Sequence, residues 1–287
     1  MNAPIGVFDS GIGGLSVLKA LRAELPLEDF IYIADSGHAP YGERDDAHVL
    51  ARSRALTAHL VQKNVKAVVI ACNTATAAAI NQLRAEYPQL PIIGVEPALK
   101  PAALLSRTRR IGVMATRSTL ASSRFKLLLD SLASQAEFVL QPCDGLADAI
   151  ERGIKAQAGA ESATEIIAAC ARNIRAMGQF GLENGEIDTL VLGCTHYPFA
   201  GDHLQALVGA DVTLVETGEA VARQTQRLLR AAAGSIGPAV TGPGRISLLT
   251  TGDAYTLKAA AAHWLALHEP VDLLPTRSNS LHSTPSS

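Results

Sequence analysis

AVVIACNTATAAA, residues 67–79, contains the pattern from which the rest of the chain can be interpreted. The run AVVIAC is short, apolar and rich in β-branched residues, as in a strand buried on both faces of a sheet. Cys72 ends this run. Asn73 and Thr74 then lead into an alanine-rich segment, which favours a helix. The stretch therefore predicts a buried strand that turns directly into a helix, with a cysteine at the junction.

A second stretch has the same design. DTLVLGCTHYP, residues 188–198, runs from an apolar segment into Cys194, with Thr195 and His196 directly behind it. A single cysteine at the end of a strand is usually a packed core residue. Two cysteines in matching contexts instead indicate a shared chemical role.

Short apolar runs alternate with segments of helical period along the whole chain. This alternation predicts an α/β protein with mostly parallel sheets flanked by helices. The predicted strands are IGVFD (5–9), FIYIAD (30–35), AVVIAC (67–72), PIIGV (91–95), RIGVMA (110–115), EFVLQP (137–142), TLVLGC (189–194), VTLVET (212–217) and RISLLT (245–250). Helices are predicted between most of them, including 13–25, 46–64, 124–135 and 164–179.

A weak internal repeat indicates two similar domains related by approximate two-fold pseudo-symmetry. IGVFDSGIGG aligns with IGVMATRSTL, and AVVIACNTAT aligns with TLVLGCTHYP. The segment VEPALKPAALLS (95–106), with two prolines, is the expected crossing point without a continued element. We predict a first domain from residues 1–97 plus 210–268, a second domain from 98–209, and a polar, disordered tail at 269–287.

Composition excludes several classes of function. The formal net charge is -2 and the pI is near 6.4, which argues against nucleic-acid binding. No apolar run reaches the roughly 18 residues of a membrane span, and the N-terminus does not resemble a signal peptide. We therefore expect a cytoplasmic protein that does not bind membranes. Its four cysteines are expected to be reduced thiols.

The two strand-end cysteines suit acid–base catalysis. In open parallel sheets, ligands bind beyond the carboxyl ends of the strands, where Cys72 and Cys194 both fall. A thiolate on one face of a substrate carbon can remove a proton while a thiol on the other face delivers one, which inverts the stereocentre. His196 and Asp9 are the candidate partners of the two thiols. Cys143 and Cys170 have no such context and are interpreted as structural.

Other uses of these residues must be weighed. Metal binding is disfavoured because the chain has no Cys-x-x-Cys motif, so we expect no metal. DSGIGGLS (9–16) is a glycine-rich turn that could hold a ligand carboxylate on its amides. Alternatively, it could begin a dinucleotide site with Asp35 as the ribose-binding acid, although Ser16 replaces the third small residue. Pyridoxal phosphate would need a Schiff-base lysine, and no motif places one at a strand end.

Short polar side chains cluster at the predicted strand ends, and none of these motifs has an arginine at the strand end itself. Substrate carboxylates would then be held by hydroxyl, amide and backbone N–H groups rather than by a guanidinium.

Four motifs together resemble one family. DSGIGGLSVL, PYG (40–42), ACNTATAAA and LGCTHYP occur in order from about residue 5 to about 256 and are similar to those of glutamate racemases, within the wider aspartate/glutamate racemase group. Cys-Thr-His, rather than a carboxylate after Cys-Thr, favours glutamate over aspartate. The resemblance implies two α/β domains, often in a homodimer, with the site between them. It also implies cofactor-independent interconversion of L- and D-glutamate, supplying D-glutamate for peptidoglycan.

The resemblance also implies a set of site residues. Cys72 and Cys194 would be the acid/base thiols, assisted by Asp9 and His196. The substrate-binding residues would be Ser10, Tyr41, Gly42, Asn73, Thr74, Thr116, Ser118, Glu151 and Thr195.

Overall fold

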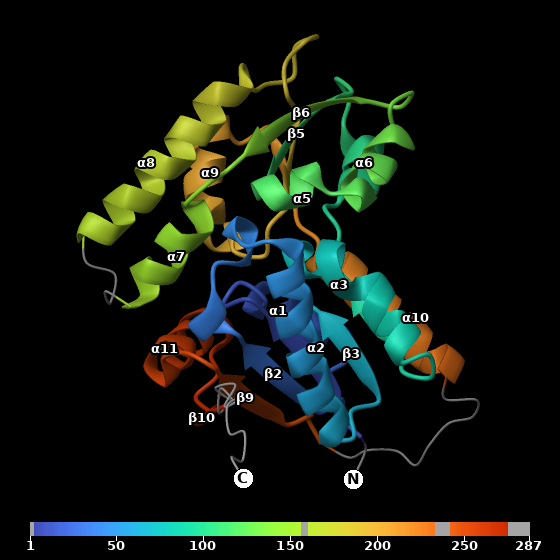
Figure 1. Cartoon of the computed structure of the whole chain (residues 1–287). Helices are drawn as coiled ribbons and strands as arrows, with labels where there is room; N and C mark the ends of the chain where they lie inside the picture. Colours follow the sequence, from blue (N-terminus) through green and yellow to red (C-terminus); the bar gives the residue numbers. More distant parts are fainter. Residues whose placement is uncertain (1–2, 156–159, 233–241, 275–287) are drawn as a thin grey trace, which may run out of the picture.

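The computed structural model describes residues 3–155, 160–232 and 242–274, and within them two parallel sheets (Figure 1). The first sheet has six strands in the order β10-β9-β2-β1-β3-β4, and the second has four in the order β6-β5-β7-β8. The strands are β1 (Ile5–Asp9), β2 (Phe30–Ala34), β3 (Ala67–Ile70), β4 (Ile92–Gly94), β5 (Arg110–Ala115), β6 (Glu137–Pro142), β7 (Thr189–Leu192), β8 (Thr213–Val215), β9 (Ile246–Thr250) and β10 (Val271–Leu273). The predicted α/β fold with parallel sheets is confirmed.

The strand order confirms the internal repeat. β2-β1-β3-β4 in the first sheet corresponds to β6-β5-β7-β8 in the second. In each unit the first strand along the chain lies in the middle, the second strand lies on one side of it and the third strand on the other. The strand before each cysteine pairs with its opening strand, Ile5 facing Ala67 in one sheet and Ile111 facing Thr189 in the other. Both cysteines therefore occupy equivalent places, beyond the carboxyl end of a central strand.

Helices cover both faces of each sheet. One face of the first sheet packs against α1 (Leu15–Glu24), α10 (Gly218–Ala232) and α11 (Ala254–Leu265), and the other against α2 (Asp46–Gln62) and α3 (Asn73–Glu86). The second sheet packs against α7 (Leu146–Lys155), α8 (Ala160–Met177) and α9 (Gly201–Val208) on one face, and against α4 (Leu99–Leu105), α5 (Arg117–Ala121) and α6 (Ser123–Asp130) on the other. Short 3-10 turns lie at η1 (Ser36–His38), η2 (Tyr41–Glu43) and η3 (Tyr197–Ala200).

Alternating side chains fill two core layers around the first sheet. Val7 of β1 joins the cluster beneath α1, whereas its neighbour Phe8 joins the cluster beneath α2 and α3. Both residues are fully buried, so β1 is apolar on both faces. This double burial explains why the strands read as continuous apolar runs in the sequence.

Three expectations about connections need correction. VTLVET, which we placed with the first domain, forms β8 of the second sheet, because the short β7–α9–β8 crossover returns it beside β7. Residues 271–273 of the expected tail form β10, which pairs with β9. The segment 95–106 contains α4, since Pro101 lies in its first turn, where a missing N–H costs nothing. The rest of the expected tail, 275–287, lies outside the described residues.

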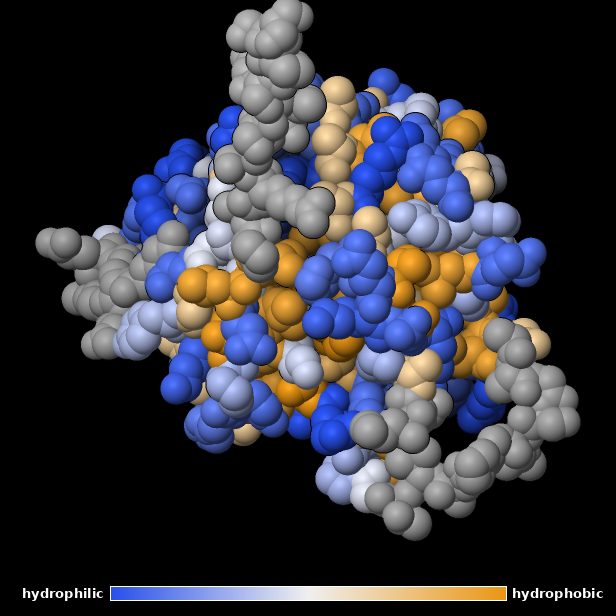
Figure 2. All heavy atoms as spheres, turned by 60° about the horizontal axis from the view of Figure 1, so that its bottom comes forward, coloured by the Kyte–Doolittle hydropathy of each residue, from blue (hydrophilic) through white to orange (hydrophobic). Residues whose placement is uncertain are grey.

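The surface is mixed in polarity. Figure 2 shows hydrophilic and apolar side chains side by side on the face that forms the lower end of Figure 1. Within the described ranges, no helix has the length and apolar character needed to cross a membrane.

Candidate active site

A cavity of about 130 Å³ lies between the carboxyl ends of the two sheets. Each sheet contributes residues from just beyond three of its strands. Ser10, Ser36 and Cys72 follow β1, β2 and β3, and Thr116, Cys143 and Cys194 follow β5, β6 and β7. The two strand-end cysteines therefore line one cavity from opposite sheets.

Cys72 is held at the beginning of a helix. It is the N-cap of α3, where its Sγ accepts a hydrogen bond from the amide of Ala75 at 3.4 Å. Its Sγ also donates a hydrogen bond to the hydroxyl of Ser10, with 3.9 Å between Sγ and Oγ. The thiol is buried, and burial together with the nearby carboxylate of Asp9 raises its pKa. In this environment Cys72 favours the protonated form.

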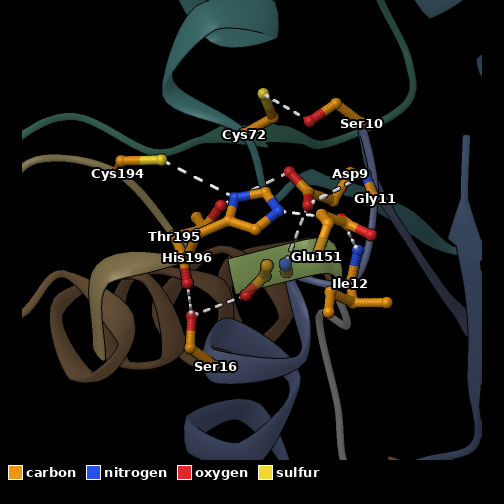
Figure 3. A network of polar contacts seen from close by, with 12 residues as sticks. Asp9, Ser10, Gly11, Ile12, Ser16, Cys72, Glu151, Cys194, Thr195 and His196 are labelled. Atoms are coloured by element: carbon orange, nitrogen blue, oxygen red, sulfur yellow. Dashed lines mark hydrogen bonds and ion pairs between the residues drawn. The ribbon is translucent and has the colours of Figure 1, made fainter. Parts of the chain in front are cut away.

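Cys194 faces a histidine instead. Its Sγ lies 3.7 Å from Nδ1 of His196, and Nε2 of the same ring lies 2.9 Å from Oε1 of Glu151 (Figure 3). All three side chains are buried. Burial opposes the imidazolium, but the hydrogen bonds to Cys194 and Glu151 outweigh it and raise the pKa of His196 well above its ordinary value. A protonated His196 next to a sulfur stabilises a thiolate.

Asp9 ends β1 and is completely buried. Its Oδ2 accepts hydrogen bonds from the amides of Gly14 at 2.9 Å and Gly11 at 3.2 Å, and its Oδ1 lies 3.5 Å from the hydroxyl of Thr195. Burial raises the pKa of Asp9, while the charge of His196 opposes that rise. Asp9 thus connects the first sheet to the loop that carries the second thiol.

The glycine-rich turn at 9–16 does not present these amides to a ligand. Two of them bind Asp9, and the amide of Ile12 donates to Oε1 of Glu151 at 2.7 Å. Our expectation that the turn holds a ligand carboxylate is therefore wrong for these three amides, because the chain's own carboxylates occupy them. Glycine is needed in this turn because the backbone lies very close to Glu151: a Cβ at Gly11 would lie 1.8 Å from Oε1 of Glu151.

Asp35 is likewise committed to the protein. Its oxygens accept hydrogen bonds from the guanidinium of Arg52 at 2.8 and 2.9 Å, from Tyr41 at 2.5 Å and from Thr251 at 2.8 Å. The carboxylate is fully buried, so it is not available to a ribose as the dinucleotide interpretation requires. Tyr41 lines the cavity, and its hydroxyl donates to Asp35 and so fixes the loop after β2.

Asn73 has an unsatisfied side chain. It follows Cys72 in α3, lines the cavity and is buried. Among the described residues, neither its Nδ2 nor its Oδ1 has a hydrogen-bond partner. A buried amide without partners is costly, which indicates that a ligand completes its hydrogen bonds.

Hydroxyl groups from the two sheets meet beside Asn73. The Oγ1 atoms of Thr74 and Thr116 are 3.1 Å apart, and Thr116 is also the N-cap of α5. A Cβ at Gly42 would lie 3.1 Å from the side chain of Thr116, so these segments are in contact. Ser118 is half-buried and does not line the cavity. The predicted residues therefore line the cavity except Ser118 and Asp9, and Asp9 lies behind the wall in contact with Thr195.

Most of the chain also matches a known family. Residues 12–225 match the model of the Asp/Glu/hydantoin racemase family. The chain belongs to this family. The resemblance seen in the four sequence motifs is thereby confirmed.

Individual members of the racemase family are similar over most of their length. The glutamate racemase of Ectopseudomonas mendocina is 50% identical over 227 residues, which cover 79% of this chain and 82% of that protein. The crystal structure of glutamate racemase isoform RacE1 from Bacillus anthracis has a TM-score of 0.81 at 29% identity, covering 96% of this chain and 98% of that one. The Escherichia coli glutamate racemase, crystallised with L-glutamate and the activator UDP-MurNAc-ala, has a TM-score of 0.79 at 28% identity, covering 95% and 98%.

Sequence reasoning missed several residues of the cavity wall. Cys143, interpreted as structural, lines it, as do Glu43, Arg117, Asp144 and Asp148. Arg117 follows Thr116 directly, so its position two residues beyond the end of the predicted strand 110–115 was a usable signal. The acidic residues lie in loops and on α7, where solvated charge is the ordinary interpretation.

Proposed function

We propose that this protein is a glutamate racemase, which interconverts L- and D-glutamate without a cofactor through two cysteines. The observation that carries the proposal is the placement of Cys72 and Cys194, from equivalent positions of two sheets, on one cavity. Family membership and the glutamate racemases among the relatives support the same substrate.

The surroundings of the two thiols suggest their resting states. Cys194 begins as the thiolate beside protonated His196, and Cys72 begins as the thiol. The Cys194 thiolate takes the α-proton of one enantiomer while Cys72 gives its proton to the opposite face of the α-carbon. The product is then the other enantiomer, with Cys194 protonated and Cys72 ionised. The reverse reaction uses the exchanged states.

The α-proton of an amino acid is far less acidic than a thiol, so the cavity must stabilise the developing carbanion. The unsatisfied amide of Asn73 and the hydroxyls of Ser10, Thr74, Thr116 and Thr195 are the proposed donors. Tyr41 and Gly42 shape the wall through contact. Glu151 acts on the site by holding His196, and Ser118 is assigned no contact.

The wider setting is also proposed. The protein supplies D-glutamate for peptidoglycan, works in the cytoplasm and forms a homodimer. Each sheet with its flanking helices is a domain. The first comprises about residues 3–97 together with the elements from α10 to β10, and the second about residues 98–215, which extends past the predicted end at 209 to include β8. Each domain then contributes one thiol.

The test is a chirality-sensitive assay of purified protein with no added cofactor. L-glutamate and D-glutamate should each approach the racemic mixture, and aspartate should react far more slowly. Cys72→Ser and Cys194→Ser should each abolish the reaction while the circular dichroism spectrum is retained. Turnover of aspartate alone would assign a different substrate, and wild-type turnover in either serine variant would contradict the two-thiol mechanism.

A further inference from the structure

The carbonyl of Thr195 lacks the backbone donor that its neighbours have. In the turn behind the second thiol, the amides of Tyr197 and Phe199 each donate to the carbonyl three residues earlier, at 3.1 and 3.0 Å. The corresponding donor for Thr195 would be the amide of residue 198. That residue is a proline and has no N–H. The loop that carries Cys194 therefore has one carbonyl that its own backbone does not satisfy.

The missing donor comes from the first sheet. Ser16 is the second residue of α1, and its Oγ lies 2.9 Å from the carbonyl oxygen of Thr195 (Figure 3). The same Oγ lies 2.9 Å from the carbonyl of Gly13, which already accepts a hydrogen bond from the amide of Ser16 at 3.0 Å. A hydroxyl has one proton, so it serves one carbonyl at a time. Because Thr195 is buried, its carbonyl is the one that depends on this hydroxyl.

The same loop is packed tightly against the turn between β1 and α1. A Cβ at Gly13 would lie 2.4 Å from Nδ1 of His196 and 2.7 Å from Oγ1 of Thr195. The hydroxyl of Thr195 also lies 3.5 Å from Oδ1 of Asp9. The side chain of Thr195 thus contacts the end of β1, and its main chain contacts α1. The first sheet therefore fixes the segment that carries the second thiol.

We propose that Ser16 is a positioning residue, which holds Cys194 and His196 in place through the carbonyl of Thr195. This inference rests on the proposed function. Ser16 lies outside the described wall of the cavity, so it acts through the loop and not on the substrate. Two-base racemisation needs each thiol within reach of its own face of the α-carbon, and a small misplacement of a reacting group lowers the rate steeply. The hydrogen bond sets the position of one thiol relative to the sheet that carries the other.

The first experiment compares steady-state racemisation of L- and D-glutamate by Ser16→Ala and Ser16→Thr. Ser16→Ala leaves a buried carbonyl without a donor, so we expect kcat to fall about tenfold with little change in KM. Ser16→Thr keeps a hydroxyl, which in a helix readily bonds the carbonyl three or four residues earlier, so most of kcat should return. Wild-type kcat in Ser16→Ala would overturn the proposal, and so would a Ser16→Thr variant as slow as Ser16→Ala.

Ser53→Ala is the matched control. Ser53 is buried in α2, and its hydroxyl donates to the carbonyl of Val49 at 2.8 Å, within the same helix. That carbonyl keeps its helical amide donor when the hydroxyl is removed, so Ser53→Ala should retain the kcat of the wild type. An equal loss of kcat in Ser53→Ala and Ser16→Ala would mean that any buried helical hydroxyl has this effect, and would overturn the specific role of Ser16.

The second experiment restores the missing amide. Pro198→Ala supplies an N–H three residues after Thr195, where a 3-10 turn directs it at that carbonyl. Ser16→Ala should then lower kcat by a smaller factor in the Pro198→Ala background than in the wild-type background, which a double-mutant cycle measures. The same factor in both backgrounds would mean that the hydroxyl does not replace the amide, and the proposal would fail.

The wild-type enzyme separates this inference from the proposed function. If it does not racemise glutamate, the proposed function fails. If it does so and the variants do not follow the expected order, only the role of Ser16 fails.

Discussion

His196 is the residue on which the asymmetry of the site depends. Its ring lies between the sulfur of Cys194 and the carboxylate of Glu151, and both contacts favour the imidazolium. Cys72 instead has the hydroxyl of Ser10 and the amide of Ala75 beside its sulfur, and its pKa is raised by burial and by Asp9. Two cysteines in equivalent places thus have different electrostatic surroundings, and the proposed resting states follow from that difference.

Glu151→Gln should change how the reaction depends on pH. Glutamine keeps the shape but removes the charge that helps to raise the pKa of His196, so that pKa falls. The imidazolium form is then lost at a lower pH, and the alkaline limb of the kcat profile should move toward acid. The test is to measure kcat of the variant and of the wild type between about pH 6 and about pH 10, the range in which tuned catalytic groups titrate.

Glu219→Gln is the control for this comparison, because Glu219 is exposed and pairs with Arg223 on α10. Its profile should coincide with that of the wild type. If the alkaline limb of the Glu151→Gln profile also coincides with that of the wild type, the ionisation of His196 does not control the reaction.

The turn between β1 and α1 shows how an element can be built around side chains from elsewhere. Its amides bind Asp9 and Glu151, and Gly11 lies so close to Glu151 that no larger residue fits. In the sequence, the same glycines are equally consistent with an anion-binding turn. Only the position of Glu151, 140 residues further along the chain, distinguishes the two interpretations.

Gly11→Ala should therefore lower both stability and activity. The added Cβ meets Oε1 of Glu151 at 1.8 Å, which must shift the carboxylate from His196. We expect a loss of about 1–3 kcal/mol in the free energy of unfolding, as for overpacking at a buried site. Urea denaturation together with the racemisation assay measures both effects.

Gly201→Ala provides the comparison for Gly11→Ala. Gly201 begins α9, and no atom lies within 4 Å of its added Cβ. Alanine there should leave activity intact and should not destabilise the protein. Equal effects of the two substitutions would contradict the close-approach role of Gly11.

The sequence predicts strands better than their assignment to sheets. The runs at 5–9, 110–115 and 137–142 match β1, β5 and β6 at both ends, because apolar patterning is a local property. The placement of β8 depends on the crossover after β7, and β10 is a short, largely exposed edge strand with little apolar signal.

The candidate site divides in the same way. The thiols, Asp9 and His196 stand at strand ends and could be found from sequence. Asp35 accepts hydrogen bonds from Arg52 and Thr251, which are distant from it in the sequence. Its structural role therefore could not be predicted from the spacing of the glycine motif.

A structural carboxylate also fixes the segment that leads into the second sheet. Asp188, just before β7, accepts hydrogen bonds from the hydroxyl of Ser106 at 2.6 Å and from the amides of Arg107 and Thr108 at 2.5 and 2.9 Å. Burial opposes the carboxylate, but these donors outweigh it and lower the pKa of Asp188. The group therefore ties the segment after α4 to the second sheet.

Asp188→Asn should destabilise the protein in a pH-dependent manner. Because the folded pKa lies below the ordinary value of 3.8, the carboxylate stabilises the fold above that value, and its contribution is lost as the pH falls through the folded pKa. We expect a loss of about 1–3 kcal/mol at neutral pH, as for charged hydrogen bonds, and a much smaller one in acid. Asp211→Asn, at an exposed position, should show neither effect. A deficit that stays constant from neutral to acidic pH would contradict this account.

The central claim is that two different groups handle the proton on the two faces of the α-carbon. The most direct measurement follows L-glutamate in D2O, without added cofactor, and determines deuterium at the α-carbon of both enantiomers at low conversion. The two-thiol account predicts deuterium in newly formed D-glutamate and almost none in the remaining L-glutamate, since one thiol delivers a solvent-derived deuteron while the other retains the proton that it removed. Equal deuterium in both enantiomers from the earliest time would show a single base exchanging with solvent, and would contradict the account.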